Sequence, residues 1–349
     1  MPAALADLET DELARVIADW GFPPSHAERV LRRFYSGQPA ADESHRLPAG
    51  LADRIAREFP PAAALAHRQT AADGTSKLLL RLGDGRTVES VLMPDYRPDR
   101  AAGCVSTQVG CAMACDFCAT TKSGFERNLS AGEIVEQFLA LRHEAGATRR
   151  RLQTLVFMGM GEPMLNLDAV LAAVRRIADN RLGGLGWRQI TVSTVGLPAA
   201  IRKLCTFEIP VTLALSLHAP FDELRRQIIP WAEYSTIEEL LDACQEWFVK
   251  TGREITLEYI MLGGVNDRPE HAEELARLAR TMRANVNLIR YNEVAGVPFA
   301  RPGTEDVRRF QEVLRAKHVN THIRASRGRD IAAACGQLRH ETAGDAKKP

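Results

Sequence analysis

Two hydrophobic periods alternate along most of this chain, and together they predict its fold class. From residue 104 onward, short apolar runs typical of buried strands are separated by amphipathic stretches typical of helices. The apolar runs are CVSTQVG, TLVFMGMG, QITVSTVG, VTLALSLH, EITLEYIML, NVNLIRYN and NTHIRAS. Strand and helix alternate about six times, which indicates an α/β protein with a parallel sheet and right-handed crossovers. An open doubly wound sheet and a full or partial barrel both fit this pattern.

The first part of the chain has a different pattern. The segments TDELARVIADWGF and SHAERVLRRFYSG carry apolar residues at helical spacing, and each ends near a glycine. The segment SKLLLRLGDGRTVESVLMP predicts a β-hairpin that turns at Asp84 and Gly85. The predicted parts of the chain are an N-terminal helical accessory domain over residues 1–70, a β-hairpin linker over 71–95, an α/β domain with a C-terminal cysteine segment over 96–340, and a disordered tail over 341–349.

Small and polar residues follow four of the predicted strands. Ligands of parallel α/β sheets bind beyond the carboxyl ends of the strands, so residues at these positions are candidates for a binding site. They are Gly161, Glu162 and Pro163, then Ser193 and Thr194, then Ser216, Leu217 and His218, and finally Asn292. Glycine and serine are common in such turns, so one of these positions alone is weak evidence. Four of them in the same topological place are stronger evidence.

Composition excludes few functions. The chain has 349 residues, of which 45% are hydrophobic and 26% are charged, so it can bury a large core. Its net charge of +1 says nothing about a nucleic-acid partner, so any RNA-binding surface would have to be a local patch. The N-terminus does not have the pattern of a signal peptide, and no apolar run reaches the roughly 18 residues needed to span a bilayer. We therefore expect a cytoplasmic protein that does not bind membranes.

The chain has seven cysteines, which in such a protein favour metal binding or catalysis over a disulfide framework. Three of them, Cys111, Cys115 and Cys118, stand close together in the sequence GCAMACDFCATT. A structural zinc site takes four ligands, and Cys104 is a candidate for the fourth. An iron–sulfur cube held by only three thiolates leaves one iron open to bind a small molecule. Two others, Cys205 and Cys244, lie in apolar helical contexts typical of packing.

The spacing CxxxCxxC, with the aromatic Phe117 before the last cysteine, resembles the radical SAM superfamily. This resemblance implies a 4Fe-4S cluster with S-adenosylmethionine on its open iron. It also implies that the α/β domain is a partial (β/α)6 TIM-like barrel. Electron transfer to the bound S-adenosylmethionine would produce a 5′-deoxyadenosyl radical, which a closed and dry cavity protects.

Further motifs narrow the resemblance. The sequences CVSTQVGCAMACDFCAT and RASRGRDIAAACGQL, together with VFMGMGEPMLN, VSTVG, LSLHAP and YIMLGGVND, resemble the RlmN/Cfr family of RNA methyltransferases. The resemblance covers about residues 86–338 and, more loosely, the N-terminal helical unit. The two outlying cysteine motifs make it specific to this family, whereas the three-cysteine loop alone indicates only the superfamily.

The resemblance implies a role for each matching residue. The cluster would be held by Cys111, Cys115 and Cys118. S-adenosylmethionine would be bound by Gly161, Glu162, Ser193, Ser216, Leu217, His218 and Asn292. The catalytic residues would be Cys335, which is methylated, Cys104, which resolves the intermediate, and Glu89, which acts as a base.

These roles form one chemical sequence. The target ring carbons of adenine are too electron-poor to take a methyl group directly from a sulfonium. As a thiolate, Cys335 would take the methyl group from one S-adenosylmethionine molecule. The radical formed from a second S-adenosylmethionine molecule would then remove a hydrogen atom from this methyl group. The resulting carbon radical would add to the ring, and Glu89 would take the ring proton. Cys104 would then form a disulfide with Cys335 and release the RNA.

The resemblance implies that the target is carbon 2 of an adenosine in 23S ribosomal RNA, with a tRNA adenosine as a second substrate. Trp231 and Ala232, and also Arg290 and Tyr291, depart from the pattern of carbon-2 members. Because Arg-Tyr is more frequent in the carbon-8 branch, methylation of carbon 8 stays the alternative. Two other hypotheses also stay open. One is a radical SAM enzyme that acts on a non-RNA substrate, and the other is an RNA-binding module that is stabilised by a metal ion and has no catalytic activity.

The expected partners follow from the same resemblance. They are the RNA, which we expect the N-terminal helical unit to contact, and an electron donor of the flavodoxin or ferredoxin type. A monomer is the default expectation for the oligomeric state.

Overall fold

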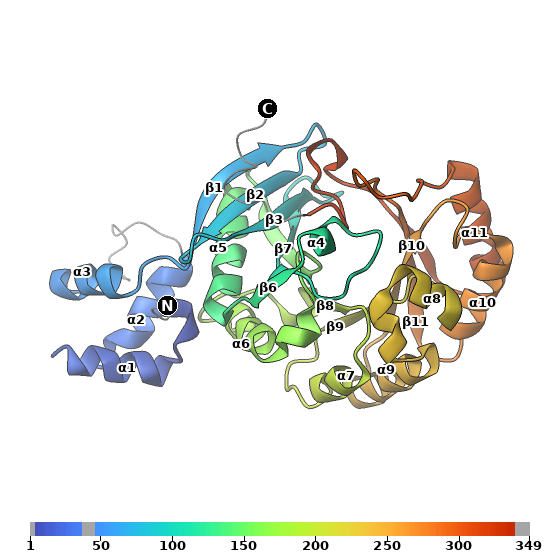
Figure 1. The fold of residues 1–349 in the computed structure, drawn as a ribbon. Helices are drawn as coiled ribbons and strands as arrows, with labels where there is room; N and C mark the ends of the chain where they lie inside the picture. The colour runs from blue at the N-terminus through green and yellow to red at the C-terminus, as the bar shows by residue number, and fades with distance from the viewer. Residues whose placement is uncertain (1–3, 37–45, 339–349) are drawn as a thin grey trace.

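The computed structural model describes residues 4–36 and 46–338, so the predicted tail lies outside the described residues. A large sheet forms the centre of the molecule, and a small helical unit lies beside it (Figure 1). The helices are α1 (Thr10–Asp19), α2 (His26–Ser36), α3 (Ala49–Glu58), α4 (Ala119–Lys122), α5 (Ala131–Ala147), α6 (Leu167–Ala178), α7 (Pro198–Leu204), α8 (Asp222–Ile228), α9 (Ile237–Thr251), α10 (Pro269–Ala279) and α11 (Thr304–Ala316). The strands are β1 (Ala63–Thr70), β2 (Ser76–Leu82), β3 (Thr87–Pro94), β4 (Arg100–Cys104), β5 (Gln108–Gly110), β6 (Phe125–Asn128), β7 (Arg151–Phe157), β8 (Ile190–Thr194), β9 (Thr212–Ser216), β10 (Ile255–Met261), β11 (Ala284–Arg290) and β12 (Thr321–Arg324).

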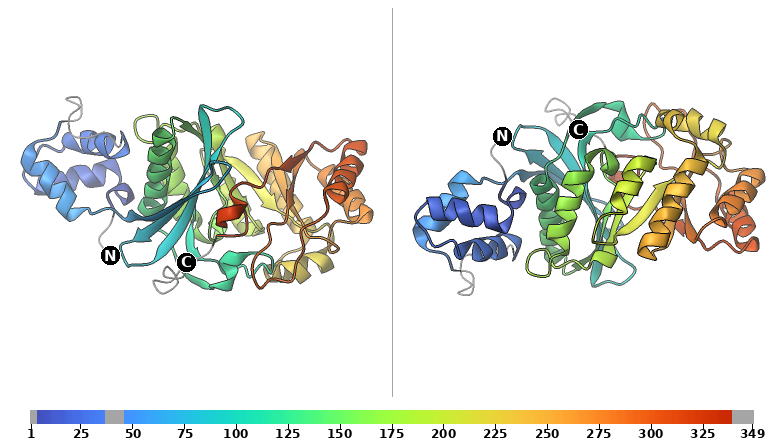
Figure 2. Two further views of the ribbon diagram at one scale, coloured as in Figure 1. Left: turned by 90° about the horizontal axis from the view of Figure 1, so that it is seen from above. Right: turned by 90° about the horizontal axis from the view of Figure 1, so that it is seen from below.

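The large sheet is an open, curved barrel. Its strand order is β1-β2-β3-β4-β7-β8-β9-β10-β11-β12. From β4 to β12 the neighbouring strands are parallel, and the connections between them contain α5, α6, α7, α9, α10 and α11. Within the described residues, β1 and β12 each pair with a single neighbour, so the sheet does not close. The predicted α/β fold with a partial six-unit barrel is confirmed, and helices cover its outer face (Figure 2).

The antiparallel end of the sheet differs from the predicted hairpin linker. The hairpin forms as β2 and β3, but β1 adds to one side of it and β4 pairs antiparallel with its other side. It is therefore a continuation of the barrel sheet. Strand β1 also occupies residues that we expected to be helical, because nearly all of its side chains are exposed and no apolar alternation marks it as a strand. The division of the chain into domains stays a prediction.

Local sequence explains where the longer helices begin. Ser130 accepts a hydrogen bond at its side chain from the backbone of Glu133 (3.1 Å), and Glu133 accepts one in return from the backbone of Ser130 (2.9 Å). Thr236 and Glu239 form the same reciprocal pair at the start of α9. Such capping boxes satisfy backbone donors that a helix leaves unpaired. Gly252, with a φ of 67°, ends α9 in the left-handed conformation that glycine favours.

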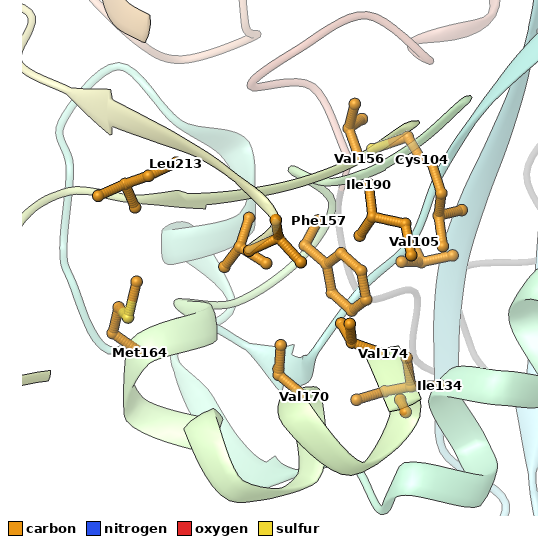
Figure 3. Packing of buried hydrophobic residues seen from close by; sticks show 14 of the residues in the cluster. Cys104, Val105, Ile134, Val156, Phe157, Met164, Val170, Val174, Ile190 and Leu213 are labelled. Carbon is orange, nitrogen blue, oxygen red and sulfur yellow. The ribbon is translucent and has the colours of Figure 1, made fainter. Parts of the chain in front are cut away.

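The core between the sheet and its helices fixes the ends of the parallel strands. Ile134 of α5 and Val170 and Val174 of α6 lie against Phe157 of β7 and Ile190 of β8 (Figure 3). All five side chains are fully buried. Burying a side chain of this size contributes roughly 1.5–3 kcal/mol, so this layer holds the strands rigidly. The loops that follow β7 and β8 therefore start from fixed positions.

The N-terminal helical unit is attached to the barrel through α5 and α6. The carboxylate of Asp7 accepts a hydrogen bond from the backbone of Gly132 in the first turn of α5 (2.6 Å). Arg176 of α6 donates to the carbonyl of Asp7 and to the carboxylate of Glu9, both at 2.9 Å. Among the described residues, every helix is too short or too polar to cross a bilayer.

Candidate active site

The three-cysteine loop is held in shape by bonds from its own backbone and from its neighbours. The amide of Cys118 donates to the carbonyl of Cys115 at 3.1 Å. The hydroxyl of Thr121 donates to the carbonyls of both cysteines, at 3.0 and 2.9 Å. The amide of Asp116 donates to the carbonyl of Ile228 at 3.1 Å, which ties the loop to the end of α8. The cysteine side chains are thus presented from a fixed backbone.

All three cysteines of this loop line one cavity at the carboxyl ends of the parallel strands. We call it the cluster cavity. Five of the seven residues predicted to bind S-adenosylmethionine line the same cavity. They are Gly161 and Glu162 after β7, Ser193 in β8, Ser216 in β9 and His218 just after β9. Residues from three strand ends and one loop therefore meet at one place, as the topological argument predicts.

The cluster cavity suits a group that binds thiolates. Burial raises the pKa of Cys111 to about 12, and it also raises the pKa values of Cys115 and Cys118. Thiols in such surroundings become thiolates when a metal centre binds them. Among the described residues, no three His, Cys, Asp or Glu side chains converge as the ligands of one metal ion would. A four-iron cube does not require such convergence, because each thiolate binds a different iron. The donor set therefore fits the implied cluster.

Gly161 and Glu162 shape part of the cavity wall close to Cys111. Gly161 has a φ of 99°, and a Cβ atom at this position would lie 2.6 Å from the side chain of Gln108, so only glycine fits. The Glu162 carboxylate accepts hydrogen bonds from the amides of Val195 and Met164, both at 2.9 Å. Burial raises the pKa of Glu162 to about 7, although these two hydrogen bonds lower it. Glu162 thereby joins the loop after β8 to the loop after β7.

The residues at the ends of β8 and β9 contribute in different ways. The hydroxyl groups of Ser193 and Ser216 are 3.2 Å apart and face each other across the two strands. The Nδ1 atom of His218 accepts a hydrogen bond from the amide of Ile260 at 3.0 Å. Burial and, to a smaller extent, the charge of Arg225 lower the pKa of His218 to about 3, so the ring is neutral. The side chain of Leu217 is fully buried in the core and does not line the cluster cavity.

A second cavity adjoins the first, and we call it the thiol cavity. Cys104, Cys335 and Asn292 line it together with Val91 and Met93 of β3. Cys335 lines both cavities, and so does Arg324. Burial raises the pKa of Cys104 to about 12, and the nearby Cys335 adds to the effect. Both cysteines are free thiols in this structure.

The segment that carries Cys335 is attached on several sides. The carbonyl of Cys335 accepts a hydrogen bond from the side chain of Asn292 (3.3 Å). The next carbonyl, of Gly336, accepts from the amide of Ala119 directly after the three-cysteine loop (2.7 Å). The hydroxyl of Thr120 donates to the carbonyl of Leu338 (2.6 Å). Asn292, predicted to bind S-adenosylmethionine, therefore lies in the thiol cavity and holds the Cys335 backbone.

Glu89 lies on the thiol-cavity side of β3 but does not line either cavity. Its carboxylate forms an ion pair with Lys77 of β2 at 2.8 Å, and the Glu89 side chain is 1% exposed. Sequence reasoning did not identify Lys77, because a lysine at the start of an apolar strand run is usually solvated. The register between β2 and β3, which brings the two residues together, is set only in the folded sheet.

Two further charged residues were missed by sequence reasoning. Arg324 at the end of β12 and Glu258 in β10 form a largely buried ion pair at 3.4 Å, and both line the cluster cavity. The charge of Glu258 raises the pKa of Arg324, and Cys335 and Cys104 act in the same direction. A glutamate inside the apolar run EITLEYIML is the signal that could have found this pair, because a charge is rarely buried in a strand without a partner.

The comparisons with known proteins agree with this site. A family model described as the radical SAM superfamily matches residues 105–279, half of the chain, and includes the three-cysteine loop. A solved structure of a radical SAM methyltransferase from Sphaerobacter thermophilus is similar to 97% of this chain and 99% of its own, with a TM-score of 0.92 and 42% identity. The fold and the site thus define a radical SAM enzyme.

The curated relatives narrow this class. A probable dual-specificity RNA methyltransferase RlmN 1 from Opitutus terrae is 56% identical over 345 residues, which is 97% of each chain. The ribosomal RNA large subunit methyltransferase N from Nitrosopumilus maritimus is 41% identical over 348 residues, 96% of this chain and 97% of its own. The chain therefore belongs to the RlmN family of radical SAM RNA methyltransferases, as its motifs predicted. The family implies S-adenosylmethionine and a 4Fe-4S cluster as cofactors.

Proposed function

We propose that this chain methylates carbon 2 of an adenosine in 23S ribosomal RNA, with Cys335 as the methyl carrier. The observation that carries the proposal is the position of Cys335 in the common wall of the cluster cavity and the thiol cavity. From this wall the thiol faces S-adenosylmethionine in one cavity, and RNA and Cys104 in the other. The transfer of a methyl group through a protein thiol requires such a position, because two partners must reach the same sulfur in turn.

In this proposal the residues of the cluster cavity bind the cofactors. Cys111, Cys115 and Cys118 hold the cluster, which when bound supplies the electron that cleaves S-adenosylmethionine and so starts the radical chemistry. The wall built from Gly161, Glu162 and the two serines orients S-adenosylmethionine. Two molecules of S-adenosylmethionine are used in each turnover, one as methyl donor and one as radical source.

The residues of the thiol cavity complete the reaction. Glu89 takes the proton from the ring carbon of the protein–RNA adduct. Cys104 then attacks the sulfur of Cys335 and forms a disulfide with it. The bond between that sulfur and the new carbon breaks, and the carbon keeps the electron pair and takes up a proton to become the methyl group. An external reductant restores the two thiols. Both thiols line the same cavity, which supports direct attack of one on the other.

Carbon 2 is favoured over carbon 8 by the family to which the chain belongs. The relatives named RlmN are similar to nearly the whole chain. The two residues that suggested the carbon-8 branch, Arg290 and Tyr291, do not line either cavity: the Tyr291 side chain is buried, and Arg290 donates to the hydroxyl of Thr304 at 3.2 Å. Their identity is therefore compatible with either product, and the family membership supports carbon 2.

Several relatives are named probable dual-specificity RNA methyltransferases, which favours a second substrate. We propose tRNA, with the target adenosine beside the anticodon. An electron donor of the flavodoxin or ferredoxin type, a monomeric state and a cytoplasmic location complete the proposal.

Nucleoside mass spectrometry tests the proposed product. Protein reconstituted without oxygen is incubated with ribosomal RNA and S-adenosylmethionine that carries a deuterated methyl group. We expect label in 2-methyladenosine after digestion, by comparison with standards of the 2- and 8-methyl isomers. Label in 8-methyladenosine alone would contradict the proposed regiochemistry. The same assay on tRNA tests the second substrate.

The Cys104→Ala variant tests the carrier mechanism. Without the attacking thiol, RNA should stay bound to Cys335, and the adduct should migrate above the free protein on a denaturing gel. Cys205→Ala is the matched control, because Cys205 lies outside both cavities. If the Cys104→Ala variant turns over like the control and shows no adduct, the resolving role is wrong.

A further inference from the structure

The ion pair between Lys77 and Glu89 is unusual because both partners are almost fully buried. Lys77 Nζ lies 2.8 Å from Glu89 Oε1, and the exposed fractions of the two side chains are 9% and 1%. Removing two charges from water costs about as much as their attraction returns, so such a pair contributes little stability compared with apolar residues of the same size. Stability alone is therefore a weak reason for this lysine.

The position of the pair relates it to the thiol cavity. Side chains alternate between the two faces of a strand, so Glu89, Val91 and Met93 share one face of β3. Val91 and Met93 line the thiol cavity, and Val91 is paired in the sheet with Cys104. On the neighbouring strand, Lys77 is paired with Val91, so its side chain lies on the same face. The ion pair therefore continues the cavity wall along the sheet.

The backbone of Glu89 is held independently of this ion pair. Its carbonyl accepts a hydrogen bond from the hydroxyl of Ser106 at 2.7 Å, and its amide donates to the sulfur of Met160 at 3.4 Å. These contacts fix where the side chain starts. The charge of Lys77 acts on the carboxylate itself, at the other end of the side chain.

We propose that Lys77 is a positioning residue for Glu89, whose carboxylate it holds ionised and in place to take the ring proton. The inference rests on the proposed function, in which Glu89 is the base. In the step concerned, an O–H bond forms on Glu89 and the ring C–H bond breaks, and the electron pair of that bond stays with the ring. A buried carboxylate without a cation beside it favours its protonated form, which cannot accept this proton.

The test compares four variants of the full-length, cluster-loaded protein. Lys77→Met removes the charge, Lys77→Arg keeps it, and Glu89→Gln removes the base. Lys203→Met is the matched control, because Lys203 forms a comparable lysine–carboxylate pair with Asp168 at 2.6 Å on the exposed surface. Each variant is assayed for methylation of Cys335 in the absence of RNA by intact mass, for protein–RNA adduct on denaturing gels, and for turnover with ribosomal RNA.

For Lys77→Met we expect normal methylation of Cys335, accumulated protein–RNA adduct, and turnover lowered by about tenfold or more, since a positioned base contributes roughly 10²- to 10⁴-fold. Lys77→Arg should recover most of the turnover, and Lys203→Met should behave as the unmodified protein. A purely structural role would instead lower Cys335 methylation together with turnover, with no adduct.

The outcomes separate this inference from the proposed function. If Glu89→Gln accumulates adduct while Lys77→Met turns over normally, Glu89 is the base and the role of Lys77 is refuted. If Lys77→Met loses Cys335 methylation and Lys77→Arg restores nothing, the role of Lys77 is structural, and the inference is refuted as well. If Glu89→Gln itself turns over without adduct, Glu89 is not the base, and the part of the proposed function on which the inference rests is wrong.

Discussion

At the scale of single residues, the cysteines fall into groups with different surroundings. Cys115 lies in the cluster cavity with two other thiols, whereas Cys205 packs at the end of α7 and donates to the carbonyl of Ile201 at 3.3 Å. Both side chains are buried and both have raised pKa values, so neither burial nor the pKa distinguishes them. Only the convergence of three thiols on one cavity does.

Replacing Cys115 by alanine should therefore abolish cluster loading. Two thiolates are too few to hold a four-iron cube that the family binds with three. We expect iron and sulfide contents near zero and no visible absorption after reconstitution without oxygen. Cys205→Ala should load the cluster like the unmodified protein, and equal loading of the two variants would contradict the assignment of the cluster cavity.

The same scale shows what the sequence could and could not predict about the site. Short-range spacing selected the three cysteines of the loop, and the position at each strand end selected Ser193 and Ser216; the structure brings all five residues to one cavity. Residues that depend on pairing between distant strands, such as Lys77 and Arg324, were missed, because their partners are set by sheet register. Leu217 was included because of its neighbours in the motif, but its side chain faces the core.

At the scale of elements, the Cys335 segment and the first strands of the sheet support each other. Asp73, in the turn between β1 and β2, accepts a hydrogen bond from the amide of Gly328 at 3.1 Å. Asp330 accepts one in return from the amide of Ala72 at 2.9 Å. In Figure 1 this last part of the described chain, drawn in red, lies beside the turn between β1 and β2. The segment that carries Cys335 is thus anchored to the antiparallel end of the sheet.

Asp330→Ala should loosen this anchor without affecting the cluster. The loss of one such hydrogen bond costs about 0.5–1.5 kcal/mol, which corresponds to a drop of roughly two- to tenfold in the rate of Cys335 methylation if the anchored position is the reactive one. Methylation is followed by intact mass, and iron content serves as the internal check. Asp168→Ala is the control, because Asp168 is exposed on α6. An unchanged methylation rate would mean that the anchor does not position Cys335.

A second element-scale prediction concerns the turn between β2 and β3. Asp84 in this turn binds Arg127 of β6 at 2.8 Å and Arg86 at 2.9 Å. Burial opposes its charge, but hydrogen bonds from these two arginines outweigh burial and lower the pKa of Asp84 from 3.8 to about 2. The ionised form therefore stabilises the fold above pH 3.8, and this contribution is lost as the pH falls towards 2.

Asp84→Asn should lower the melting temperature of the cluster-free protein at pH 7, and the difference from the unmodified protein should shrink as the pH approaches 2. Thermal melts followed by circular dichroism over this range measure both effects. Asp99→Asn is the control, since Asp99 is 75% exposed and its distance to Arg100 is 3.9 Å. A difference that stays constant with pH would show that the ionised pair is not the cause.

The elements also show why prediction from sequence succeeded for the parallel part of the sheet, from β4 to β12. Nearly all residues of the parallel strands are buried or partly buried, and each strand lies next to an amphipathic helix, so two strong patterns alternate. Strand β1 has neither feature: its side chains are nearly all exposed, and it follows a helix in the antiparallel part of the sheet. Its strand state depends on pairing with β2, which no local pattern reveals.

At the scale of the whole molecule, two parts far apart in sequence meet around α5. The start of the chain packs against the first turn of this helix through Asp7, and the middle of the helix packs against the sheet that carries the active site. Gly132 in that first turn has no room for a side chain: a Cβ atom would lie 2.6 Å from the Cβ of Ala4 and 3.0 Å from Asp7. The absence of a side chain at one position therefore allows the N-terminal unit to dock.

Gly132→Ala should push the N-terminal unit away from the barrel while the barrel itself stays folded. We expect faster amide hydrogen exchange over residues 5–19, an unchanged iron content and normal methylation of Cys335. Turnover with RNA should fall if this unit contacts the substrate, as we expect. Gly146→Ala is the matched control, because it lies in the same helix with no atom within 4 Å of the added Cβ. If amide hydrogen exchange over residues 5–19 is unchanged in Gly132→Ala, the contact between α5 and the N-terminal unit adjusts to the added methyl group and the unit stays docked. If Cys335 methylation is lost, docking of the N-terminal unit supports the active site itself.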